Sequence, residues 1–89
     1  MNWELFGMAA GAITSSGFLP QIIKGYRTKK LEDLSYFMNI LLGAGMVMWI
    51  VYGLHIMSIS VVAANLVGVS LNIILIVMKY VYSKKNQKT

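Results

Sequence analysis

The sequence is poor in the residues from which most active sites are built. It contains no cysteine, one histidine and three acidic residues among 89 positions. The absence of cysteine excludes disulfide bonds and thiolate metal sites, and it leaves the redox state of the compartment open. The histidine and the acidic residues are too few for a metal site or a pair of catalytic carboxylates; they are His55, Glu4, Glu32 and Asp33. We therefore predict no metal, no cofactor and no enzymatic activity.

Most of the chain is apolar. Apolar residues make up 57% of the sequence, and the mean hydropathy is +0.66. A soluble domain of this length leaves much of its surface in water, so it would expose large apolar patches and aggregate. The lipid bilayer must therefore be the solvent.

The apolar residues form three stretches that are long enough to cross a membrane, which takes about 20 helical residues. They cover residues 5–23, 36–56 and 59–82. A polar loop at 24–35 joins the first two stretches, whereas the second and third are so close that they must form a tight antiparallel hairpin. We predict an all-α membrane protein, a single three-helix transmembrane domain over residues 1–89, with a polar tail at 83–89.

The basic residues predict the orientation of the helices. All eight lie in two blocks, Lys24, Arg27, Lys29 and Lys30 in the loop and Lys79, Lys84, Lys85 and Lys88 around the end of the third stretch. Loops rich in Lys and Arg stay in the cytoplasm, so we expect the loop and the C-terminus inside and the N-terminus outside. Because the basic residues form blocks between apolar stretches, the net charge of +5 does not lead us to expect nucleic-acid binding.

A proline lies inside the first apolar stretch and is followed by a glutamine. Pro20 cannot donate a hydrogen bond to the carbonyl of Ser16, so the helix should bend there. In lipid the freed carbonyl and the Gln21 amide both need partners, which places this point in protein or beside a water-filled cavity. The bend is either a hinge or a static kink.

A tryptophan lies within the second stretch, too deep for an interfacial anchor. Tyr52 and Ile56 follow Trp49 at intervals that put them on roughly the same helical face. The indole ring has two possible uses at this depth: it fills space against other helices, or it offers a flat apolar surface and one donor to a ligand. The residues alone leave both readings open.

Polar side chains recur in the third stretch. Asn65 and Asn72 are seven residues apart and share a face, which must point at protein or water because a buried amide in hydrocarbon needs hydrogen bonds. The amides either hold helices together or line a polar site. Small residues four apart, Gly7 with Gly11 and Ala64 with Gly68, predict close helix packing.

No charged residue lies in the middle of any predicted span, so the proton and sodium sites of coupled transporters have no evident ligand. A passive carrier of a neutral polar solute fits better. Three helices have no room for a central cavity lined from several sides, so a second copy is needed. Two copies with the same orientation would be parallel and would bring Trp49 and Asn65 together around one site near the midplane.

These residues resemble those of a known family. Pro20 and Gln21, the loop ending in Leu34-Ser35, the glycine-rich second helix with Trp49-Ile50-Val51-Tyr52-Gly53, and Ala64-Asn65 are similar to the pattern of the SemiSWEETs, the bacterial half-transporters of the SWEET and PQ-loop group. The resemblance covers nearly the whole chain. It implies a parallel homodimer in the bacterial plasma membrane that passes sugar by facilitated diffusion through outward-open, occluded and inward-open forms.

The resemblance also implies roles for individual residues. Trp49 and Asn65 match the sugar-binding pair, Pro20 with Gln21 matches the hinge, and Tyr52 matches an outer gate. The connection after the second helix lacks the charged residues that reinforce this gate in some relatives. We expect further cavity lining from Phe18, Asn39 and Asn72.

Two other functions share this architecture. A PQ-loop carrier of an amino acid or another small solute would have the same fold, but it should show a charged site group or acid coupling. An accessory subunit that transports nothing would also be small and tri-helical, and it would give no flux in liposomes.

Overall fold

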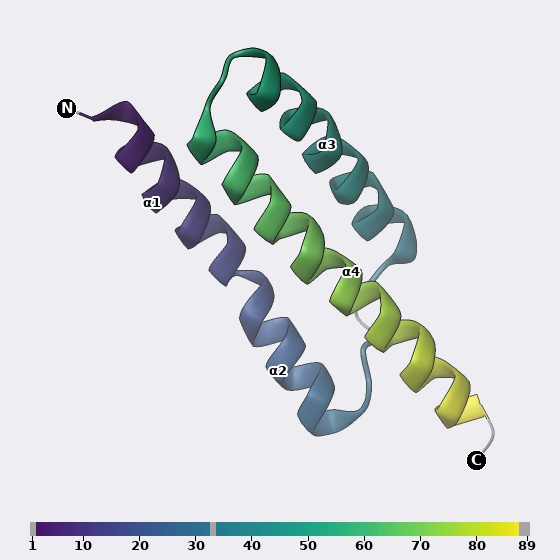
Figure 1. The fold of residues 1–89 in the computed structure, drawn as a ribbon. Coiled ribbons are helices and arrows are strands. Elements are labelled where there is room, and N and C mark those ends of the chain that lie inside the picture. The colour runs from purple at the N-terminus through teal and green to yellow at the C-terminus, as the bar shows by residue number, and fades with distance from the viewer. Residues whose placement is uncertain (1, 33, 88–89) are drawn as a thin grey trace.

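The computed structural model describes residues 2–32 and 34–87, which are helical nearly throughout (Figure 1). The helices are α1 (Trp3–Ser16), α2 (Phe18–Thr28), α3 (Tyr36–His55) and α4 (Ile59–Gln87). No strand is found in the described residues. Three helical segments, α1 with α2, α3, and α4, are long and apolar enough to cross a membrane. The predicted all-α fold with three spans is confirmed, and the protein is a multi-pass membrane protein.

The last helix lies in the middle of the fold. α4 packs against α1, α2 and α3, whereas within the described ranges α3 contacts neither α1 nor α2. Figure 1 shows α4 running between α3 and the pair α1 and α2. The protein measures 54 × 21 × 14 Å, so it is little more than one helix thick. Most large apolar side chains are therefore exposed in the single chain, and Leu31 and Leu75 are the buried ones among the residues that the structure describes.

Short-range hydrogen bonds set the ends of the helices. The Asn2 side chain caps α1, and the Ser35 hydroxyl caps α3 by accepting from the Met38 N–H at 3.3 Å. Lys29 ends α2 in the left-handed conformation, with its N–H bonded to the Gly25 carbonyl at 2.8 Å.

The α3–α4 turn is a tight one. Met57 is left-handed, and the N–H groups of Met57 and Ser58 donate back to the carbonyls of Leu54 and Gly53. This is a Schellman motif, which satisfies two of the carbonyls at the end of α3. The predicted tight hairpin is observed.

Two helices run further than the apolar stretches. The first helical segment continues from residue 23 to Thr28, and α4 continues from residue 82 to Gln87. Hydropathy measures where lipid surrounds the chain, whereas Lys, Arg and Gln are good helix formers that prolong a helix beyond the hydrocarbon. The loop is thus 29–35 instead of 24–35, and the predicted polar tail is helical as far as the described residues reach; Lys88 lies beyond them.

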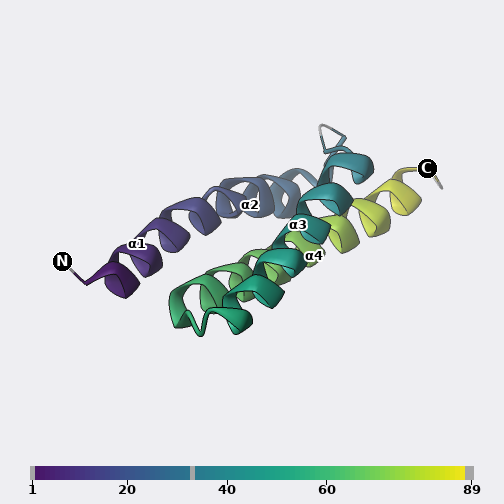
Figure 2. The ribbon, with the colours of Figure 1, turned by 90° about the horizontal axis from the view of Figure 1, so that it is seen from above.

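The first span is interrupted at Gly17, three residues before Pro20. The Gly17 N–H bonds to the carbonyl of Thr14 at 3.1 Å, one residue nearer than an α-helix requires, and the Ser16 hydroxyl bonds to the Ile13 carbonyl at 2.7 Å. The break lies next to the Ser16 carbonyl, which receives no hydrogen bond from Pro20 because proline has no backbone N–H. Figure 2 shows the helix axis turning between α1 and α2.

Candidate functional site

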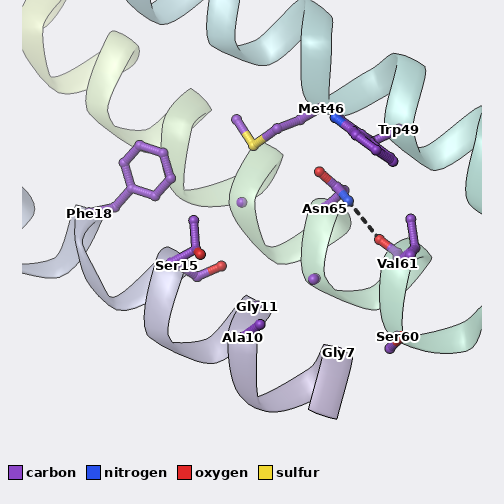
Figure 3. A pocket seen from close by; sticks show the side chains of 13 residues that line it. Gly7, Ala10, Gly11, Ser15, Phe18, Met46, Trp49, Ser60, Val61 and Asn65 are labelled. Carbon is purple, nitrogen blue, oxygen red and sulfur yellow. Dashed lines mark hydrogen bonds between the residues drawn. The ribbon is translucent and has the colours of Figure 1, made fainter. Parts of the chain in front are cut away.

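A half-open cavity of about 260 Å³ lies between α1 and α3, with α4 as its floor (Figure 3). Residues from all four helices line it, and none carries a formal charge. From α1 and α2 they are Gly7, Ala10, Gly11, Thr14, Ser15 and Phe18; from α3 and α4 they are Met46, Trp49, Ser60, Val61, Ala64, Asn65 and Gly68.

Small residues let α1 approach α4 along one edge of the cavity. A Cβ atom added to Gly11 would collide with the Ala64 side chain, and one added to Gly7 would collide with Ser60. Gly68 faces α3 instead, where the Met46 sulfur occupies the space of a side chain. The predicted close packing of small residues is observed, with different partners for Ala64 and Gly68.

The Trp49 indole lines the cavity from α3. Its ring stacks edge to face on Tyr52, with the ring centroids 5.6 Å apart. Trp49 is 54% exposed and Tyr52 is 50% exposed, so both rings are largely uncovered in the single chain. Tyr52 is not among the residues that line the 260 Å³ cavity; it lies one turn beyond it.

Asn65 lines the same cavity from α4. Its Nδ2 donates one hydrogen bond to the Val61 carbonyl of its own helix at 2.8 Å (Figure 3). The amide carries two N–H groups and an acceptor oxygen, so one N–H and the Oδ1 atom stay available to a ligand. The structure thus brings Trp49 and Asn65 to one cavity, with an apolar ring on one wall and a partly used amide beside it.

Asn39 and Asn72 lie away from this cavity and are paired with each other. The Asn39 Nδ2 donates to the Asn72 Oδ1 at 2.9 Å, and the Asn72 Nδ2 donates to the Asn39 carbonyl at 2.7 Å. Both are buried, and Gly43 leaves the space for the Asn72 amide. This pair joins α3 to α4, the helix-holding alternative for such amides. The structure does not place the two among the lining residues of this cavity.

Of the remaining predicted site residues, one lines the cavity and two do not. Phe18 lines the cavity at the start of α2, whereas Pro20 and Gln21 are exposed on α2 and do not line it. Sequence reasoning missed Thr14 and Ser15, which line the cavity from α1. The spacing of Gly7, Gly11 and Ser15, four residues apart each time, carried the signal because residues at this interval share a helical face.

A carboxylate joins the beginnings of α1 and α4. The Ser60 N–H and the Ser58 hydroxyl donate to the two Glu4 carboxylate oxygens at 2.7 Å and 3.0 Å. A negative charge is favoured at a helix N-terminus, where N–H groups lack partners. We call this end, residues 2–7 and 56–60, the hairpin end.

A lysine holds the opposite end together. Lys79 on α4 donates to the Leu31 carbonyl at 2.8 Å, and its Nζ lies 5.2 Å from the centre of the Tyr36 ring. Leu31 is buried against Gly25. The loop 29–35 is thereby folded onto α4. We call this end, residues 24–36 and 79–87, the basic end.

Comparisons with known proteins agree with this architecture. The family MtN3_slv, described as "Sugar efflux transporter for intercellular exchange", matches residues 4–87. A Leptospira biflexa protein named Sugar transporter SemiSWEET is 34% identical over 84 residues, which cover 94% of this chain and 96% of that protein.

Two solved structures are similar as well. The crystal structure of a bacterial homologue of SWEET transporters has a TM-score of 0.85 and 42% identity, and the match covers 89% of this chain and 95% of that one. SemiSWEET in the inward-open conformation has a TM-score of 0.78 and 32% identity, with coverages of 94% and 90%.

The fold is thus that of a family of membrane transporters. This chain belongs to the MtN3_slv family of sugar transporters, and its resemblance to the SemiSWEETs is confirmed.

Proposed function

We propose that this chain is the protomer of a homodimeric sugar transporter that works by alternating access. One observation carries the proposal: Trp49 and Asn65 line a single uncharged cavity in a chain whose relatives are named sugar transporters. An aromatic ring packs well against the C–H face of a sugar, and an amide bonds its hydroxyl groups.

The chemistry of the cavity favours a neutral, passively carried solute. Its lining contains hydroxyl, amide, indole and apolar groups and no ionisable side chain. An amino-acid substrate would leave its ammonium and carboxylate groups without charged partners, which is costly away from water. Ion coupling would likewise need a carboxylate or a similar ligand within the site. Sugar moving down its gradient needs neither.

The shape of the protomer supports a second copy. The protein is only 14 Å across its thinnest dimension, and the cavity is half open. The uncovered Trp49 and Tyr52 rings line a second, open hollow on α3, and Trp49 also lines the cavity. A parallel copy, related by an axis along the membrane normal, would close the cavity and supply a second Trp49 and Asn65.

The charges support an orientation in the bacterial plasma membrane. The basic end would lie in the cytoplasm, and the hairpin end with the N-terminus would lie outside. Tyr52 is nearer the hairpin end than Trp49 is, as an outer gate requires, and Pro20 with Gln21 follows the interruption at Gly17, as a hinge requires.

Uptake of labelled sugar into liposomes that contain the purified protein tests the proposal. We expect counterflow of at least one mono- or disaccharide from a panel. Trp49→Ala should lower it about 30-fold, the factor that corresponds to the ~2 kcal/mol typical of an anchoring aromatic side chain. Asn65→Ala should lower it as well.

Ser70→Ala is the matched control, because the Ser70 hydroxyl bonds to the Leu66 carbonyl of its own helix at 2.8 Å and does not line the cavity. No flux of any sugar by the wild-type protein would favour an accessory subunit, and flux of amino acids alone would favour the other carrier. Full activity of both the Trp49 and Asn65 variants would remove them from the site.

A further inference from the structure

The α1 wall of the cavity carries two hydroxyl groups that the sugar-binding pair does not include. Thr14 and Ser15 line the cavity from α1, whereas Trp49 and Asn65 line it from α3 and α4. Figure 3 shows Ser15 on α1 across the cavity from Met46, Trp49 and Asn65. The cavity therefore has a polar group on the side opposite the indole ring.

These two hydroxyls differ from three other Ser and Thr hydroxyls of the helices. A Ser or Thr within a helix commonly bonds to a carbonyl one turn earlier. Ser16, Thr28 and Ser70 do so, with distances of 2.7 Å, 2.8 Å and 2.8 Å. The side chains of Thr14 and Ser15 make no hydrogen bond to any residue in 2–32 or 34–87, so each keeps one donor and its acceptor lone pairs.

The Ser15 oxygen is accessible although the residue is nearly buried. Ser15 is 8% exposed as a whole. In the described part of the chain, every fully buried side-chain nitrogen or oxygen has a hydrogen-bond partner. Because the Ser15 hydroxyl has none, its oxygen must belong to the exposed part. Ser15 borders this cavity and also a second hollow between α1 and α4.

The other polar groups of the cavity are already partly used. The Ser60 hydroxyl shares a hydrogen bond with the Ser58 hydroxyl at 3.2 Å, and Asn65 donates one N–H to the Val61 carbonyl. Two unused hydroxyls in a membrane protein are costly unless they meet water or a ligand. A sugar in this cavity has hydroxyl groups around its rim, which can both donate to and accept from Thr14 and Ser15.

We propose that Thr14 and Ser15 form a second polar wall that hydrogen-bonds the sugar hydroxyls on the edge facing α1, and that they determine which sugars are carried. The inference rests on the proposed sugar transport. A site built to bond a substrate hydroxyl discriminates strongly against the analogue that lacks it. The wall therefore selects sugars that have a hydroxyl on that edge over the corresponding deoxy sugars.

The test is counterflow in liposomes with one transported sugar and its series of monodeoxy analogues. Thr14→Val preserves the shape of the side chain and removes the hydroxyl, and Ser15→Ala removes a single atom. Each should lower transport of the parent sugar about fivefold, the usual effect of losing one hydrogen bond. Transport of the one deoxy analogue that lacks the contacted hydroxyl should hardly change, because variant and analogue remove the same interaction.

Matched variants separate recognition from packing. Thr14→Ser keeps the hydroxyl that Thr14→Val removes, so it should keep the preference for the parent sugar. Ser70→Ala should leave the whole series unchanged. An equal loss for every sugar in the series would assign Thr14 and Ser15 to helix packing and overturn the proposal. An unchanged series would overturn it too, while loss of counterflow in Trp49→Ala would show that the transport function itself stands.

Discussion

The two ends of the protein are held together in different ways. At the hairpin end the chain passes from α3 to α4 in three residues, and Glu4 ties α1 to the first turn of α4. At the basic end a loop of seven residues joins α2 to α3, and Lys79 holds this loop through a backbone carbonyl. The interruption at Gly17 separates the two halves of the first span.

This difference indicates which part of the chain can change shape. At the hairpin end, a tight turn, a carboxylate bridge and close contacts of small residues make α1, α3 and α4 one unit. At the basic end, α2 follows a break in the helix and leads into the longer loop. We therefore expect a transport cycle to move α2 against α4 more than α1 against α4.

The largest effect on stability should come from Gly11→Ala on α1. A Cβ at this position would collide with Ala64, so α1 must move away from α4. Overpacking of this kind typically costs about 1–3 kcal/mol, which thermal unfolding in detergent would measure. Gly45→Ala on α3 is the control, because nothing lies within 4 Å of a Cβ there. Equal unfolding temperatures for the two variants would refute the tight α1–α4 contact.

Pro20→Ala, in the first turn of α2, should act on the rate of transport. Alanine supplies the N–H that the Ser16 carbonyl lacks, so the helix can close over the interruption at Gly17. One added hydrogen bond of about 1–1.5 kcal/mol would slow a hinge motion by roughly tenfold. Counterflow rate and sugar affinity should be measured together. Weaker sugar binding with an unchanged rate would instead indicate a static kink.

A smaller and local effect is expected from Lys79→Met. Loss of the bond to the Leu31 carbonyl frees the loop 29–35 from α4. About 1 kcal/mol in a local opening equilibrium is a factor of roughly five, which amide hydrogen exchange would detect in that loop and not at residues 56–60. Lys85→Met, which replaces an exposed lysine, should leave exchange in the loop as it is. Faster exchange at both ends would mean that the ends are not independent.

The sequence predicts the membrane spans better than it predicts which residues contact one another. Long apolar stretches reveal the membrane helices because lipid contact requires apolar side chains, and helical spacing reveals that Asn65 and Asn72 share a face. It does not reveal that α4 occupies the middle, which is why the mutual pairing of Asn39 and Asn72 could not be foreseen. The availability of the Thr14 and Ser15 hydroxyls also depends on backbone partners that spacing does not specify.

The central position of α4 has a consequence for biosynthesis. A ribosome releases the chain from its N-terminus, so the other helices reach the membrane before α4 does. Since α3 contacts neither α1 nor α2, α3 has no native helix partner until α4 has been made. The amide of Asn39 can find its own partner only when Asn72 arrives. Packing of these four helices is therefore completed only when α4 has been made.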